Sequence, residues 1–207
     1  LRTRNMLGPT RITNPLLLGI DPSSTTIGYS IVEYDMATGL FYIVEASSFC
    51  APFSSMLQCL LETSEDKYRR FRIIREFISR KLSEYNISDV YCEGAYLKRG
   101  RQTAYESLLG CIHVVRDAVT ECSYTIPVTI VSASAAKEGM GVPGNSGDKL
   151  LMLNALKNKE HLIIPPYSGY VDELDQHAID AVCIAICGGM MSYRVYNDET
   201  IKKKKRK

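Results

Sequence analysis

Apolar residues in the first quarter of the chain come in short runs that are separated by turn residues. The run at 16–21 predicts a buried strand, and two further runs predict strands at 27–34 and 40–48. The segment DMATG at 35–39 has the composition of a tight turn. Three strands joined by such short connections predict an antiparallel meander.

From residue 65 onward the spacing of apolar positions changes to that of helices. Apolar side chains recur every three or four residues over 65–85, which predicts a long helix that Thr63 or Ser64 can cap. Further strands are expected at 89–93 and 128–131, and further helices at 102–120, from about 132, at 149–158 and at 173–190. A loop is expected at 159–172. The order predicts an α/β fold, with a mixed five-stranded sheet of three antiparallel strands followed by parallel strands, flanked by helices.

The length of 207 residues suits one compact domain. We expect a flexible N-terminal segment at 1–15, a single folded domain at 16–192 and a basic tail at 193–207. No apolar run is long enough to span a membrane, and the first segment has no signal-peptide core. The sequence therefore predicts no membrane association.

The net charge of +2 conceals an uneven distribution, because the final KKKKRK supplies six positive charges and the rest of the chain carries −4. A body that is not basic overall has to contact nucleic acid through local patches or tails. The basic tail fits a solvated end, an address signal or a phosphate-binding arm, and the sequence leaves these three roles open.

Seven cysteines are scattered along the chain and none forms a CxxC pair. An odd number of cysteines without metal-site spacing is typical of reduced thiols, so neither disulfides nor a zinc site is expected. We therefore expect an intracellular, reducing compartment, which can be a bacterial, phage-infected or virus-infected cytoplasm, a nucleus or an organelle.

Three acidic residues stand next to apolar segments that are expected to be buried, where a charge costs more free energy than in a solvent-exposed loop. Asp21 ends the first predicted strand, Glu93 ends the fourth, and Asp180 lies among apolar residues of the last helix. Both strands are expected to be central and parallel, so their carboxyl ends should meet at one edge of the sheet, where ligand sites form. His177 precedes Asp180 by three residues and should project beside it.

Clustered carboxylates repel one another, and a divalent cation relieves that repulsion. An oxygen-rich site favours Mg²⁺, and the imidazole of His177 makes Mn²⁺ an acceptable substitute. Two ions about 3.5–4 Å apart would suit in-line hydrolysis of a phosphodiester. Each residue also has a structural explanation: Asp21 as an Asx-turn residue, Glu93 as a solvated strand end, and His177 as an ordinary helix residue. Asp175 is a reserve ligand.

A basic loop follows Glu93. Lys98, Arg99 and Arg101 form a local positive rim beside the carboxylates and are expected to bind DNA phosphates. Tyr96 in the same loop can stack on an unpaired base, although an aromatic residue in this setting is also often a loop anchor.

Three segments together resemble motifs of the RuvC-type Holliday junction resolvases in the RNase H-like (retroviral-integrase) superfamily. They are GIDPSSTTIGYSIVE, YCEGAYLKRGRQTAYESLLG and DQHAIDAVCIAICGG, and the resemblance extends over roughly residues 16–190. The sequence between the motifs is divergent and closer to a viral or phage branch than to a standard bacterial member.

This resemblance implies an RNase H-like fold and a homodimer that binds four-way DNA junctions and nicks two opposing strands symmetrically. It implies Mg²⁺ ligation by a set of four residues, which comprises Asp21, Glu93, His177 and Asp180. It also implies a junction-probing role for Tyr96 and contacts of Lys137 and Lys149 with DNA, with Lys149 acting in catalysis at the scissile phosphate.

Other functions fit parts of the pattern. A different RNase H-like nuclease could act on flaps or RNA/DNA hybrids, and a catalytically silent protein could bind junctions without cutting them. The segment GIDPSSTTIGYS at 19–30 is also similar to the first phosphate loop of actin-like ATPases, but that fold needs two such domains. The GMGVPG segment is by itself a weak dinucleotide signal.

Overall fold

The computed structural model describes residues 14–51, 64–96, 102–146, 150–159 and 162–194. Over this part of the chain a twisted sheet of six strands has the order β5-β4-β1-β2-β3-β6. The strands are β1 (Leu16–Asp21), β2 (Thr26–Tyr34), β3 (Phe41–Cys50), β4 (Ile87–Glu93), β5 (Val128–Val131) and β6 (Ile163–Ile164). As expected for a mixed sheet, β1, β2 and β3 are antiparallel, whereas β4 and β5 continue from β1 in parallel.

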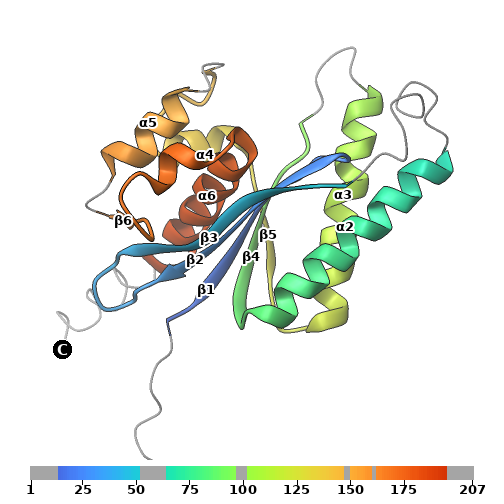
Figure 1. Ribbon diagram of the computed structural model, residues 1–207, viewed down its shortest axis with the longest axis horizontal. Helices are drawn as coiled ribbons and strands as arrows, with labels where there is room; N and C mark the ends of the chain where they lie inside the picture. The colour runs from blue at the N-terminus through green and yellow to red at the C-terminus, as the bar shows by residue number, and fades with distance from the viewer. Residues whose placement is uncertain (1–13, 52–63, 97–101, 147–149, 160–161, 195–207) are drawn as a thin grey trace, which may run out of the picture.

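Helices cover both faces of this sheet (Figure 1). The pair α2 (Ser64–Glu84) and α3 (Gln102–Cys122) packs on one face, and three helices occupy the other: α4 (Ala133–Gly139), α5 (Leu150–Asn158) and α6 (Gln176–Gly189). Each face has its own apolar cluster, because side chains of successive strand residues point to opposite sides. The α/β class with a mixed sheet flanked by helices is confirmed.

The sheet has one strand more than the five predicted. β6 consists of two residues that pair in parallel with Phe41 and Tyr42 at the edge of β3. It lies in the segment 159–172, which we expected to be a loop. A two-residue strand has no periodicity of its own to detect, and only its contact with β3 creates it.

The start of the last helix also differs from the prediction. Asp172 and Glu173 belong to a short 3-10 helix, η1 (Tyr170–Glu173), and α6 begins at Gln176. The side chain of Asp175 caps α6 by accepting a 2.9 Å hydrogen bond from the backbone NH of Ala178. At the other end a π-helical turn, η2 (Met190–Arg194), carries regular structure two residues past the predicted domain end at 192.

A partly buried polar network holds α2 against the sheet. Lys81 on α2 donates to both carboxylate oxygens of Glu45 on β3, at 2.8 and 3.0 Å, and the hydroxyls of Tyr29 and Tyr85 donate to the same carboxylate. Burial raises the pKa of Glu45, but the hydrogen bonds outweigh it and the net pKa is lowered. These hydrogen bonds fix the position of α2 relative to β3.

Two further expectations concern the described residues as a whole. The six cysteines within them carry free thiols, as predicted, while Cys59 lies outside the described residues. In the same part of the chain, no helix has the length and apolar character needed to cross a membrane.

Candidate active site

The first two predicted site residues meet at one edge of the sheet. Asp21 is the last residue of β1 and Glu93 the last residue of β4. The two strands are parallel, with Ile20 of β1 in register with Cys92 of β4, so the two carboxylates follow adjacent strand positions. The two carboxyl groups lie close enough for Asp21 to raise the pKa of Glu93. The expectation that the two strand ends converge is therefore confirmed.

Helix α6 brings the other two predicted residues to the same edge. Nδ1 of His177 lies 2.6 Å from Oδ2 of Asp21. One turn further along α6, Asp180 accepts a 2.9 Å hydrogen bond from the side-chain amide of Gln176. Its charge acts on both Glu93 and His177. All four side chains thus form one cluster, with one residue from the end of β1, one from the end of β4 and two from α6.

Two glycines allow α6 to lie this close to the strands. A Cβ atom on Gly28, which pairs with Asp21 across β1 and β2, would fall well inside contact distance of the backbone carbonyl of His177. A Cβ atom on Gly19 would collide in the same way with the carbonyl of Ala181. That carbonyl instead accepts a 3.0 Å hydrogen bond from the buried hydroxyl of Ser30. Backbone-to-backbone packing therefore sets the position of His177 and Asp180.

Replacing Gly28 with Ala should displace the start of α6 from the sheet. The added methyl group meets backbone atoms, which cannot rotate away as a side chain can, so we expect a loss of about 1–3 kcal/mol in the free energy of unfolding. Chemical denaturation monitored by circular dichroism measures this loss. Gly144→Ala is the matched control, because its closest neighbour is the end of the flexible Glu138 side chain. Equal stability of the two variants would contradict the close packing of α6.

Crowding of the carboxylates changes their proton affinities. Burial, the hydrogen bond with Asp21 and the charges of Asp21 and Asp180 raise the pKa of Glu93 to about 8. Burial is also the main reason that the pKa of Asp180 is raised. The hydrogen bond to Asp21 raises the pKa of His177. Without a neutralising cation, the cluster therefore retains protons near neutral pH.

A pocket of about 140 Å³ opens between the carboxylates and α4. Glu93, Asp180 and Lys137 contribute to its lining, and Met152 and Ile184 are among the apolar residues that complete it. Nζ of Lys137 donates a 2.6 Å hydrogen bond to the backbone carbonyl of Ser146. The charge of Lys137 lowers the pKa values of Glu93 and Asp180, although burial outweighs it in both. The pocket therefore combines two carboxylates with one positioned ammonium group.

The donor set has the chemistry that Mg²⁺ and Mn²⁺ prefer, because three carboxylates and one imidazole converge. Within the described ranges, however, no three His, Cys, Asp or Glu side chains are already arranged to hold one metal ion. The hydrogen bonds explain this: Asp21 is engaged by His177, and Asp180 by Gln176. Rotation of these carboxylates away from their present partners would make the same oxygens available to a cation.

Of the remaining predicted site residues, the structure describes some and leaves others outside the described ranges. Tyr96 is 79% exposed just beyond Glu93, which leaves its ring accessible. The four other basic residues that were expected to contact DNA lie outside the described residues: Lys98, Arg99, Arg101 and Lys149. Asp175, the reserve ligand, caps α6 and accepts a hydrogen bond from the hydroxyl of Ser48.

Sequence reasoning missed three residues that shape the cluster. Gly19 and Gly28 give α6 its close approach, and Gln176 orients Asp180. A signal for the glycines existed, because glycine inside a predicted strand often marks a close approach of another backbone. Gln176 had no such signal. Its hydrogen bond to Asp180 can be inferred only once it is known that α6 begins directly after the Asp175 cap.

Comparison with solved structures shows which known proteins share this fold. No family model and no curated protein sequence matches the chain. Among solved structures, Thermus thermophilus RuvC in complex with a Holliday junction substrate is 16% identical, with 83% of this chain and 91% of that chain covered and a TM-score of 0.59. The yeast mitochondrial Holliday junction resolvase Ydc2 is 11% identical, with coverage of 91% and 85% and a TM-score of 0.62. The chain has the RuvC fold.

The shared fold covers most of both chains in each comparison. The resemblance first indicated by three sequence motifs is thus confirmed at the level of structure. At 11–16% identity the likeness establishes the fold, and the chemistry of the site has to be argued from this chain's own residues.

Proposed function

We propose that this protein is a structure-specific endonuclease that resolves four-way DNA junctions by paired, symmetric, metal-dependent phosphodiester hydrolysis. The observation that carries the proposal is the convergence of Asp21, Glu93 and Asp180 at one sheet edge of a RuvC fold. Structures with this fold include resolvases bound to Holliday junction DNA. A buried acidic cluster is costly to maintain for stability alone, which favours a catalytic role.

The carboxylates and His177 would hold Mg²⁺, or Mn²⁺ as a substitute, in a site for two ions per active centre. When bound, such ions activate water and stabilise the charge that develops on the phosphate. The raised pKa of Glu93 supports this role, because a cation would replace the protons that the cluster otherwise retains. The 2.6 Å contact between His177 and Asp21 already holds these two proposed ligands side by side.

Basic groups around the cluster would bind and orient the DNA. Lys137 lines the pocket beside Glu93 and Asp180, where its ammonium group can contact the scissile phosphate. Lys149, Lys98, Arg99 and Arg101 are proposed to add backbone contacts, with Lys149 acting at the scissile phosphate. The exposed ring of Tyr96 would stack on a base at the junction centre.

A homodimer would present two such clusters, one for each of two opposing strands. A four-way junction has two-fold symmetry, and a symmetric dimer matches it. Paired nicks then require only that each protomer cuts the strand that it holds. Sedimentation of the protein with and without junction DNA measures the proposed dimer.

A cleavage assay with three substrates tests this function. Labelled four-way junction, flap and RNA/DNA hybrid are incubated with the full chain, with and without Mg²⁺ or Mn²⁺. We expect two symmetric nicks in the junction, only when metal is present. Cleavage of the flap or degradation of the hybrid in preference to the junction would identify a different RNase H-like nuclease. Binding of the junction without any cleavage would identify a silent binding protein.

A further inference from the structure

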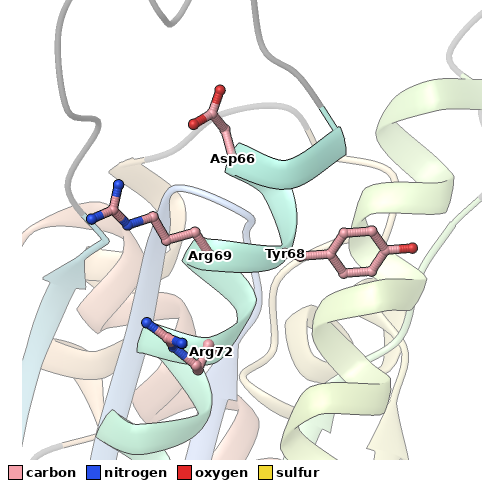
Figure 2. A pocket seen from close by; sticks show the side chains of 4 residues that line it. All are labelled: Asp66, Tyr68, Arg69 and Arg72. Atoms are coloured by element: carbon pink, nitrogen blue, oxygen red, sulfur yellow. The ribbon is translucent and has the colours of Figure 1, made fainter.

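A second pocket lies against the first turns of α2 (Figure 2). Its volume is about 660 Å³, and among the described residues Asp66, Tyr68, Arg69 and Arg72 line it. Figure 2 shows the side chains of Arg69 and Arg72 extending from the same side of the helix, while Tyr68 leaves on the opposite side. Residues three apart on a helix are neighbours, so two guanidinium groups face one opening.

The fold makes little use of these two arginines. Arg72 has Glu76 as a partner at 3.8 Å, with both side chains 71% exposed, and such surface pairs contribute little to stability. Arg69 is exposed and makes no ion pair with any residue in the described parts of the chain. By contrast, Arg75 on the same helix pairs with Glu121 of α3 and so joins two helices. Arg69 and Arg72 are therefore available to a ligand.

The neighbouring residue Arg70 ties this pocket to the active-site edge. Arg70 is only 3% exposed, and its Nε donates a 3.0 Å hydrogen bond to the backbone carbonyl of Ser24. Ser24 follows Asp21 by three residues, which a fully extended chain spans in about 10 Å. The first turns of α2 are thus anchored to the turn that leaves the catalytic strand, and the pocket has a fixed place beside it.

We propose that Arg69 and Arg72 bind the phosphodiester backbone of a duplex DNA arm that extends away from the active site. This inference rests on the proposed function and deepens it by naming a second contact region on the substrate. A guanidinium group matches phosphate geometry with two donors. A duplex carries a phosphate on each strand about every 3.4 Å of its axis, so two neighbouring arginines can engage one stretch of backbone. Such contacts position the arm without reading its sequence.

The salt dependence of junction binding tests this site. The full chain and the double variant Arg69→Gln/Arg72→Gln are titrated with labelled junction between 50 and 200 mM salt, without divalent metal. Each lost phosphate contact should lower the slope of log affinity against log salt by about 0.9. The double variant should therefore have a slope about 1.8 smaller. Raising the salt from 50 to 200 mM weakens DNA binding by both proteins. The factor by which it weakens binding should be roughly twelvefold smaller for the double variant than for the unmodified protein.

Arg80→Gln is the matched control for Arg72→Gln. Arg80 is also an exposed arginine on α2, and it pairs with Glu84 at 3.7 Å as Arg72 pairs with Glu76 at 3.8 Å. It lies eight residues further along the helix, about 12 Å from Arg72 and away from the pocket. We expect Arg80→Gln to leave the slope unchanged, whereas Arg72→Gln lowers it by about 0.9.

Three results would overturn the inference: an unchanged slope in the double variant, an equal decrease in the control, or no binding of DNA by the unmodified protein. Thermal unfolding of each variant, together with sedimentation, separates lost contacts from lost folding or an altered oligomeric state. The proposed function is tested independently by junction cleavage with metal. A protein that cuts junctions but keeps its slope in the double variant retains its function and refutes only this site.

Discussion

Replacing Asp180 with Asn should abolish junction cleavage while leaving junction binding within a few-fold of its original strength. The substitution keeps the shape of the side chain but removes the charge that would hold and orient the proposed cation at the pocket shared with Glu93. Loss of one group that stabilises the transition state typically costs a hundredfold to a thousandfold, and a metal ligand should cost at least as much. Asp21→Asn should have the same effect. Single-turnover cleavage of labelled junction measures the loss.

Asp172→Asn is the matched control for Asp180→Asn. Asp172 is a half-exposed carboxylate on η1, where it pairs with Lys157 instead of contacting the cluster. The control should cleave at the original rate, since its charge is screened by solvent. Near-normal cleavage by Asp180→Asn, with the protein folded and binding junctions, would remove Asp180 from the catalytic set.

Replacing Glu93 with Gln should have two opposite effects. It should abolish cleavage, and it should stabilise the metal-free protein at neutral pH. The pKa of Glu93 is raised from 4.5 to about 8, so the native protein retains a proton that the unfolded chain has already released. Stability therefore falls as pH rises from about 4.5 to about 8, by an amount on the order of a few kcal/mol. A neutral amide avoids this loss.

Thermal unfolding in the presence of a chelator, at pH 4 and at pH 8, checks the second effect. The variant should be close to the unmodified protein at pH 4 and more stable at pH 8. Adding Mg²⁺ or Mn²⁺ at pH 8 should then stabilise the unmodified protein more than the variant, since the cation replaces the missing proton. Glu106→Gln, at an exposed position of α3, should show neither difference. A pH-independent difference at Glu93 would contradict a crowded carboxylate.

The positions of the three clustered carboxylates were predictable because they follow from local signals. An apolar run that stops at an acid identifies Asp21 and Glu93, and the rule that parallel strand ends share an edge brings them together. Asp180 stands out because its neighbours on α6 are apolar. None of these inferences needs the details of packing, and the structure places all three carboxylates on the expected elements.

What could not be predicted depends on contacts between distant segments. The 2.6 Å contact between His177 and Asp21 requires the exact height of α6 above the sheet, which two strand glycines set. The short strand β6 exists only through its pairing with β3. The cap at Asp175 shortened the predicted last helix by three residues, because an acidic sequence at 172–175 is compatible with several helix starts.

The placement of α6 also has a consequence for when the protein can act. Asp21 lies near the beginning of the chain and His177 lies 156 residues later, so the carboxylate cluster is completed by an element that is synthesised long after the first strand. A nascent chain that ends before α6 has both strand-end carboxylates but lacks Asp180 and the helix that covers the glycine face of β1 and β2. Contacts of such long sequence separation also form slowly. The order of synthesis therefore keeps the proposed active site incomplete until α6 has been translated.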